Sequence, residues 1–328
     1  MKIAHVVTYI SPDGAFGGLV RVALGQAEAL AERGHDVTGR ECSLLDDQLL
    51  RREVSGFRPD LVIHLGARTD LRGSTASDYA ANSIGVENLI AAIEQVGADV
   101  HTVYASSRRV FAIGHSPRST FDYKPSTPYG ASKIEGERIV RDRGQRAGTL
   151  TIVRLTSIGG PWYGTPYRDF FDMIASGRYV NFLGSDPLKS FGYVGNAVFE
   201  LKRIASAPTS VTNEQVYWLA DYEPLRLSEW ASLVSEAIGR PEPRSVPLWA
   251  GRAVAKVGDG LQRVGMKSVP LTTFRLNNLA TDMVYDTTST STVAGELPFD
   301  LREGVRRTVE WYFASRGSVV AKRDVPTR

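Results

Sequence analysis

Short apolar runs alternate with amphipathic segments along the first half of the chain. Runs of strand length lie at residues 2–8, 61–65, 102–105 and 151–155, and a further short strand is expected at 35–38. Apolar side chains recur at helical spacing over residues 20–30 and 86–93, and residues 129–140 have helical character. Strands that alternate with helices build parallel sheets covered on both faces. The pattern therefore predicts an α/β fold with a doubly wound parallel sheet.

The pattern changes after residue 160. Aromatic residues and prolines become frequent, which indicates mixed α/β structure with longer loops. The clearest predicted helix there spans Leu227 to Ile238, with Ser228 as its candidate cap, and another runs from about residue 303 to residue 313. We expect a sheet domain over residues 1–160, a smaller substrate-binding lobe over 161–314 that partly returns to the sheet, and a flexible tail over 315–328.

Composition narrows the class of protein. Of 328 residues, 42% are hydrophobic and 23% are charged, which is ordinary for a globular protein, and a net charge of +3 gives no reason to expect nucleic-acid binding. One cysteine, Cys42, excludes a disulfide within the chain, and five scattered histidines predict no metal site. No apolar run approaches the roughly 20 residues that span a bilayer. We expect a cytoplasmic protein without a membrane span.

A tyrosine and a lysine stand four residues apart in the segment Tyr129-Gly130-Ala131-Ser132-Lys133. On a helix this spacing puts both side chains on one face. Free tyrosine has a pKa of about 10 and is a poor base at neutral pH, but a neighbouring ammonium favours the phenolate and lowers that pKa. The pair could therefore take a proton from a hydroxyl group while hydride leaves its carbon. Alone, such spacing also arises by chance on solvated helix faces.

Two hydroxyls, Ser106 and Ser107, end the predicted strand that precedes this pair. Open α/β sheets bind their ligands at the carboxyl ends of the strands. Ser107 could therefore hydrogen-bond the reacting oxygen and stabilise its developing charge. The structural alternative is a pair of serines that cap a turn.

These motifs occur within a longer pattern that resembles a known family, the extended short-chain dehydrogenase/reductases of the NAD-dependent sugar-nucleotide epimerase/dehydratase type. The matching segments, in the family's order, are PDLVIHLGA (59–67), Asn82 with GVENLI (85–90), YASSRRVF (104–111) and TPYGASKIEGE (127–137). The similarity continues more loosely through residues 153–161, 189–197, 217–225 and 303–311, and covers roughly four-fifths of the chain.

The resemblance implies a Rossmann-like sheet with a smaller C-terminal lobe, bound NAD or NADP, and a nucleotide-sugar substrate. It assigns Ser107, Tyr129 and Lys133 to the catalytic triad, with Lys133 also on the cofactor ribose. Gly66, Ala67 and Ser106 would lie against the cofactor. Ser157 and Lys189 are candidate substrate contacts, Lys189 in place of the family's pyrophosphate-binding arginine, and Tyr167 and Arg275 are weaker candidates. It further implies a homodimer formed through the helix that carries Tyr129.

The N-terminus departs from the family pattern. Its phosphate-binding loop reads Gly14-x-x-Gly17-Gly18, without the third glycine, and Glu41 is the candidate ribose-binding acid. Residues 1–38 resemble the start of a GT-B-fold glycosyltransferase. Two rival hypotheses therefore stay open: a glycosyltransferase, and a non-catalytic nucleotide-binding relic.

A second departure concerns the residues after Ser107. Dehydratases of this family carry an acidic pair there, whereas this chain has Arg108 and Arg109. Two cations cannot serve as that acid and base. The sequence therefore disfavours a dehydratase and leaves an epimerase or a keto-reductase.

Overall fold

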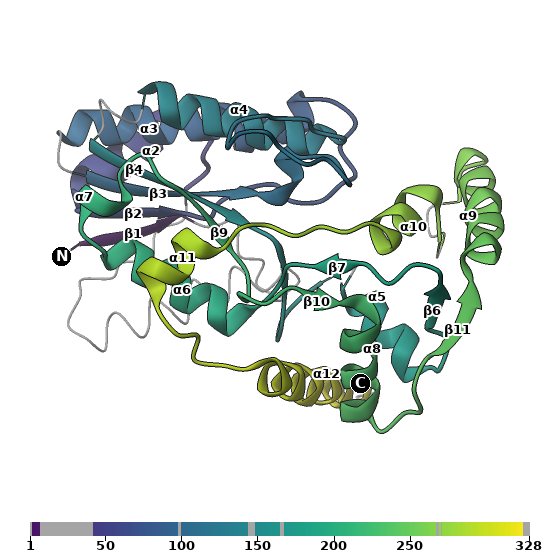
Figure 1. Cartoon of the computed structure of the whole chain (residues 1–328). Helices are drawn as coiled ribbons and strands as arrows, with labels where there is room; N and C mark the ends of the chain where they lie inside the picture. Colours follow the sequence, from purple (N-terminus) through teal and green to yellow (C-terminus); the bar gives the residue numbers. More distant parts are fainter. Residues whose placement is uncertain are drawn as a thin grey trace, which may run out of the picture. The chain divides into compact units, whose positions relative to one another are not determined.

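The chain forms two compact units (Figure 1), each built from three separate segments. The computed structural model describes residues 2–6, 42–97, 100–143, 148–164, 167–266, 269 and 271–323. The first unit comprises Met1–Ile158, Val194–Ala220 and Asp286–Pro298, and the second comprises Gly159–Tyr193, Asp221–Tyr285 and Phe299–Arg328. The predicted strand at 35–38 and the predicted helix at 20–30 lie outside the described residues.

In the described part of the chain, a five-stranded parallel sheet organises the first unit, in the order β1-β2-β3-β4-β9. Its strands are β1 (Ile3–Val6), β2 (Leu61–His64), β3 (Val100–Ser107), β4 (Gly148–Leu155) and β9 (Val216–Leu219). Its helices are α2 (Asp47–Phe57), η1 (Ser77–Asn82), α3 (Ile84–Val96), η2 (Arg108–Val110), α4 (Pro128–Arg143), α6 (Val194–Ser206), α7 (Thr209–Thr212) and α11 (Thr288–Ala294). The short strand β5 (Ser157–Gly159) lies at the junction of the units. The predicted doubly wound parallel sheet is confirmed.

Alternate strand residues fill two cores, one on each face of the sheet. Val62, Tyr104 and Ile152 belong to the core covered by α2, α3 and α4. Ile63, Val103 and Val153 belong to the opposite core, to which α6 and β9 contribute. In Figure 1, α3 and α4 lie on one side of the sheet and α6 and α11 on the other. Because both faces are covered, β2 is buried at every position and β3 at every position except Ser107.

The second unit is mixed α/β. Its helices are α5 (Tyr167–Ala175), α8 (Leu227–Ile238), α9 (Leu248–Arg263), α10 (Thr273–Ala280) and α12 (Leu301–Arg323). Its strands are β6 (Val180–Leu183), β7 (Leu188–Lys189), β8 (Phe191–Tyr193), β10 (Leu225–Arg226) and β11 (Arg244–Pro247). Helix α12 continues to Arg323, past residue 315, where the sequence predicts a flexible tail. Arg316 pairs there with Asp172 at 3.1 Å.

Aromatic side chains make the core of the second unit. Tyr163 and Phe171 pack with Tyr312 of α12, and Phe170 stacks on Trp230 of α8 with ring centroids 4.4 Å apart. Since stacked and edge-on rings bury large areas, this cluster holds α5, α8 and α12 together. No helix in the described part of the chain is long and apolar enough to cross a membrane.

Candidate active site

Strands β2 and β3 are parallel neighbours, so their carboxyl ends lie at the same end of the sheet. Asn82 holds the loop that follows β2. Gly66 and Ala67 follow β2 after Leu65 and are buried. The Oδ1 atom of Asn82 accepts the backbone N–H of Arg68 at 2.8 Å, and its Nδ2 donates to the Arg68 carbonyl and to Ser132 Oγ, both at 2.9 Å. One amide thus ties the loop after Ala67 to helix α4.

Helix α4 places Tyr129 and Lys133 one turn apart and buried. The helix begins at Pro128, and Thr127 Oγ1 accepts the backbone N–H of Gly130 at 3.0 Å. Tyr129 is 8% exposed and Lys133 is 2% exposed. A Cβ atom at Gly130 would come within 2.2 Å of the Arg109 carbonyl oxygen. Glycine at that position therefore lets the first turn of α4 lie directly on η2, which begins immediately after Ser107.

Ser107 ends β3 and caps η2. Its Oγ atom accepts the backbone N–H of Arg109 at 3.3 Å. A serine hydroxyl that accepts one hydrogen bond keeps its own O–H for donation. The capping alternative and the catalytic assignment are therefore compatible for this residue.

The Lys133 ammonium sits in an apolar and aromatic environment. It lies 4.6 Å from the centroid of the Tyr104 ring. Burial lowers the pKa of Lys133 to about 8, against the opposing attraction of Glu137. His64 of β2 lies beside the same tyrosine, with ring centroids 5.5 Å apart, and burial followed by repulsion from Lys133 lowers its pKa to about 3. His64 is therefore neutral, and the ammonium is the positive charge of this cluster.

A buried ion pair anchors the next turn of α4. Arg154 of β4 donates to both carboxylate oxygens of Glu137, at 2.9 and 2.7 Å, and to the Thr120 carbonyl at 2.8 Å. Tyr123 Oη donates to Glu137 at 2.7 Å. Arg154 and Glu137 are 1% and 0% exposed. Because Glu137 stands one turn beyond Lys133, this pair fixes the helix that presents the lysine.

Near the end of β3, the hydroxyl of Ser106 is a polar group that a cofactor could bind. Ser106 Oγ is buried and has no hydrogen-bond partner among the described residues. A buried hydroxyl without a partner is costly unless a ligand satisfies it. Together with buried Gly66 and Ala67, it fits the cofactor position that the resemblance implies. Gly14, Gly17, Gly18 and Glu41 lie outside the described residues.

The candidate substrate residues have other partners. Ser157 is buried at the end of the first unit. Tyr167 packs edge-on against Tyr163 with centroids 6.5 Å apart. Lys189 is buried and its Nζ donates to the carbonyls of Asn278, at 2.6 Å, and Thr281, at 2.5 Å. Arg275 donates to the Val269 carbonyl at 3.1 Å.

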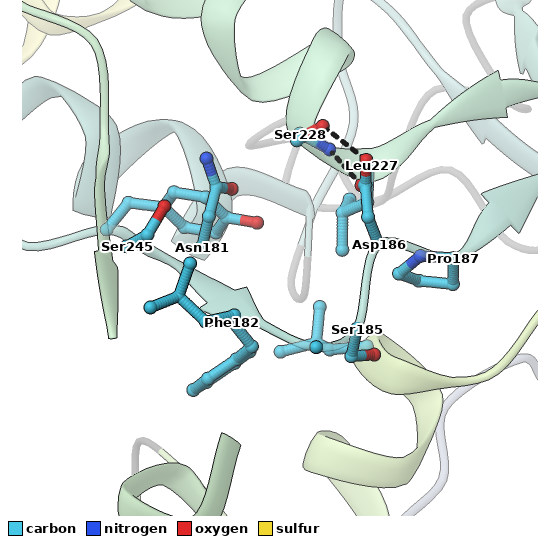
Figure 2. Close-up of a pocket in the computed structure, with 12 residues that line it drawn as sticks. Asn181, Phe182, Ser185, Asp186, Pro187, Leu227, Ser228 and Ser245 are labelled. Atoms are coloured by element: carbon cyan, nitrogen blue, oxygen red, sulfur yellow. Dashed lines mark hydrogen bonds between the residues drawn. The ribbon is translucent and has the colours of Figure 1, made fainter. Parts of the chain in front are cut away.

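The second unit contains a cavity of about 440 Å³ that sequence reasoning missed (Figure 2). Its lining comes from β6, the following loop, the start of α8, β11 and α10: Tyr179, Asn181, Phe182, Leu183, Gly184, Ser185, Asp186, Pro187, Leu227, Ser228, Ser245 and Leu279. None of the four candidate substrate residues lines it. The one local signal in the sequence is the turn-forming run Gly184-Ser185-Asp186-Pro187, where Gly184 has a φ of 81°.

One predicted cap is wrong. Ser228 does not cap α8, whose N-cap position is Arg226. Instead the Asp186 carboxylate accepts the Ser228 backbone N–H at 3.0 Å and the Ser228 hydroxyl at 2.7 Å (Figure 2). An acid from a distant loop therefore satisfies the free N–H at this helix start, a contact that local sequence cannot reveal.

The model of the NAD dependent epimerase/dehydratase family matches residues 13–220 of this chain. The chain belongs to this family. The match covers the segment with Gly14, Gly17 and Gly18 as well as Ser107, Tyr129 and Lys133. The family is NAD-dependent, so the enzyme and cofactor assignments that follow from the resemblance are confirmed at family level.

Similar proteins include family members with different substrates. An N-acetyl-α-D-glucosaminyl-diphospho-ditrans,octacis-undecaprenol 4-epimerase of Escherichia coli O157:H7 is 27% identical, over 85% of this chain and 83% of the relative. A 3β-hydroxysteroid dehydrogenase/Δ5→4-isomerase of Mycobacterium tuberculosis is 28% identical, over 80% of this chain and 79% of the relative. The UDP-glucose 4-epimerase of Thermus thermophilus, solved with NAD, shares the fold with a TM-score of 0.66 at 19% identity, covering 96% of this chain and 100% of that structure.

No group of three or more His, Cys, Asp or Glu side chains gathers in the described part of this epimerase/dehydratase family member in a way that could hold a metal ion. Ser106 and Ser107 end β3, and Tyr129 and Lys133 lie on the adjoining helix α4.

Proposed function

We propose that the protein is an NAD-dependent epimerase or oxidoreductase that acts on a nucleotide-linked sugar, with Tyr129, Lys133 and Ser107 as catalytic residues. The observation that supports it is a buried ammonium one helical turn from a buried phenol, on a helix packed against the strand that ends at Ser107. Gly66, Ala67, Ser106 and Lys133 would hold the cofactor, with Gly14, Gly17, Gly18 and Glu41 on its phosphates and ribose.

The chain's own residues manage the proton. With a pKa of about 8, Lys133 stays charged at pH 7, by about ten to one, and so favours the phenolate of Tyr129. Tyr129 takes the proton from the sugar hydroxyl and returns it in the reverse direction. The Ser107 O–H donates to the same sugar oxygen. Gly66, Ala67 and Ser106 would hold NAD, which would supply the hydride acceptor and donor for this chemistry.

The residues after Ser107 restrict the reaction class. Arg108 is buried and Arg109 follows it in η2. Guanidinium groups do not lose protons in proteins, so these positions cannot supply the acid and base of an elimination. The proposal is therefore an epimerase or keto-reductase, and not a dehydratase.

A second candidate substrate differs in its carrier. The similarity to the Escherichia coli epimerase, which acts on a sugar joined through diphosphate to undecaprenol, extends over most of both chains. The steroid-dehydrogenase relative also acts on a lipid-like molecule. A sugar on a polyprenyl diphosphate presents the same reacting hydroxyl and the same diphosphate as a nucleotide sugar, so the catalytic residues would be unchanged.

The decisive experiment compares Tyr129→Phe with wild type. Purified protein is incubated with NAD and separately with UDP-hexoses and an N-acetylhexosamine on a polyprenyl diphosphate, and the products are resolved by chromatography. We expect Tyr129→Phe to lower kcat by 10²- to 10⁴-fold, as for loss of a general base. Tyr217→Phe is the matched control, because Tyr217 Oη on the edge strand β9 donates only a 3.3 Å bond to Val211.

Thermal unfolding with and without cofactor distinguishes the proposed enzyme from a non-catalytic nucleotide-binding relic. NAD at 100 times its Kd should stabilise both variants by about 2.7 kcal/mol. Absence of any shift with NAD or NADP would contradict the proposal and favour a non-catalytic relic. Release of free nucleotide from a sugar donor would favour a glycosyltransferase.

We also propose that the protein forms a homodimer through α4. We propose a cytoplasmic location as well, and the single cysteine supports it.

A further inference from the structure

Helix α9 in the second unit buries its small residues and exposes its large apolar ones. Gly251, Ala255 and Gly258 form its buried side. A Cβ atom at Gly251 would come within 2.5 Å of the Phe182 ring, and one at Gly258 within 1.9 Å of the Leu271 carbonyl oxygen. These glycines therefore let α9 lie very close to β6 and to the segment before α10, with the opposite side facing outward.

The outward side of α9 is apolar. Trp249 and Val257 are 71% and 64% exposed, and their spacing of eight residues puts them on one side of the helix. Val264, which directly follows α9, is 78% exposed. Seven of the sixteen large apolar side chains exposed in the described part of the chain fall within residues 249–274: Trp249, Val254, Val257, Leu261, Val264, Met266 and Phe274. We call these seven the α9 patch. Such a concentration marks an interaction surface.

Cations flank the α9 patch. Arg252, Lys256 and Arg263 are exposed and follow one another at helical spacing along one edge of the apolar side. The one acid of α9, Asp259, accepts the backbone N–H of Thr273 at 2.9 Å, and hydrogen bonds to Thr273 lower its pKa. Arg252 and Lys256 form no ion pair with a described residue. Arg263 attracts the Asp259 carboxylate, so the patch presents apolar side chains beside two unpaired cations and one that is partly compensated.

We propose that the α9 patch docks on an anionic lipid bilayer, with α9 parallel to the membrane surface. An interfacial helix has an apolar face with aromatic and aliphatic side chains and a flank rich in Lys and Arg, as here. Trp249 would lie at the level of the lipid headgroups, where indole rings are enriched. The cations meet the negative surface potential. Since no described helix can cross a membrane, the contact is peripheral.

A second copy of the chain fits this surface less well. Two-fold interfaces place the same patch against itself, so the three cations of one copy would approach those of the other. Like charges brought together in this way oppose association. An anionic surface, in contrast, satisfies the apolar residues and the charges at once. The inference goes beyond the proposed function and does not depend on it.

The test is sedimentation of the full chain with vesicles, without cofactor or substrate. Vesicles of phosphatidylcholine are compared with vesicles that contain 30 mol% phosphatidylglycerol, about the anionic content needed for an appreciable surface potential. We expect binding to the anionic vesicles that weakens as salt is added. The triple variant Arg252→Gln/Lys256→Gln/Arg263→Gln should bind them on the order of 100-fold more weakly, because each cation contributes about fivefold.

A second variant tests the apolar contribution. Trp249→Glu/Val257→Glu should abolish vesicle binding, whereas Val211→Glu, at a 50% exposed valine of α7, should leave it intact. Thermal unfolding checks that each variant is folded, and light scattering records its assembly state. Failure of wild type to bind vesicles would overturn the proposal. So would equal binding by Trp249→Glu/Val257→Glu, or a loss of dimer in that variant while vesicle binding persists.

Discussion

His64 is a buried imidazole held against a positive charge. Its side chain is 2% exposed, and neither ring nitrogen has a hydrogen-bond partner among the described residues. Protonation would place a second cation beside Lys133 in an apolar environment, which is why burial and that lysine lower the pKa of His64 to about 3. The unfolded chain has no such cost, and its histidine protonates at the ordinary pKa of about 6.5.

The difference makes stability depend on pH. Below pH 6.5 the unfolded state binds the proton and the folded state does not, so the contribution of His64 to stability falls as pH drops from 6.5 toward 3. Between pH 7 and pH 5 wild type should lose about 2 kcal/mol relative to His64→Leu, which cannot titrate. Urea unfolding of both proteins at each pH measures this. If the free energies of unfolding of wild type and His64→Leu change equally between pH 7 and pH 5, the environment assigned to His64 is wrong.

Sequence reasoning at the residue scale foresaw where the three catalytic candidates lie in the fold, and their catalytic roles stay predictions. Tyr129, Lys133 and Ser107 were selected by spacing and by strand ends, and the structure places all three on adjoining elements of the first unit. It could not foresee that Lys189 donates to the carbonyls of Asn278 and Thr281, because those partners lie about ninety residues away. Their position depends on how the second unit folds.

At the scale of elements, the start of α8 depends on Asp186. This helix has no side-chain cap of its own, and Asp186 accepts both the backbone N–H and the hydroxyl of Ser228. A carboxylate also interacts favourably with the positive end of the helix dipole. The loop after β6 is thereby tied to α8, and the two together line the cavity.

Removing that carboxylate should weaken the second unit. Asp186→Ala should lower the free energy of unfolding by about 1 kcal/mol, as for loss of a cap. Ser228→Ala should cost less, because the backbone N–H keeps its partner. Glu223→Ala, at an exposed acid nearby, is the control and should change stability by less than about 0.5 kcal/mol. If thermal unfolding gives the Asp186 and Glu223 variants equal stability, the contact between Asp186 and Ser228 does not stabilise the protein.

Helices α8 and α9 show what apolar spacing in a sequence can and cannot predict. The predicted helix at 227–238 has the bounds observed for α8, because its apolar residues face the core at helical spacing. In α9 the relation is reversed: Gly251, Ala255 and Gly258 are buried and the large apolar residues point outward. Periodicity arguments assume that apolar residues face a core. The apolar residues of α9 also recur at helical spacing, so the pattern could indicate a helix but not that its apolar side faces outward.

At the scale of the whole molecule, the chain passes between its two units five times, at residues 158, 193, 220, 285 and 298. The prediction placed the first domain at residues 1–160 and had the following lobe, 161–314, return partly to the sheet. Leu201 and Ile204 of α6 and Tyr217 and Leu219 of β9 belong to the same core as Ile63, Val103 and Val153. Residues 194–220, to which the chain returns after its first passage through the second unit, therefore complete the core on one face of the sheet.

This arrangement predicts that residues 1–160 do not fold alone. Burial of four large side chains stabilises by roughly 6–12 kcal/mol, at 1.5–3 kcal/mol each. That equals most of the 5–15 kcal/mol that typically separates folded from unfolded domains. The fragment should bind a hydrophobic dye strongly and unfold without a cooperative transition. A chain in which a flexible linker joins residue 158 to residues 194–220 restores α6 and β9, and should regain cooperative unfolding by circular dichroism. If the 1–160 fragment unfolds as cooperatively as the linked chain, the core on that face of the sheet does not need the returning segment.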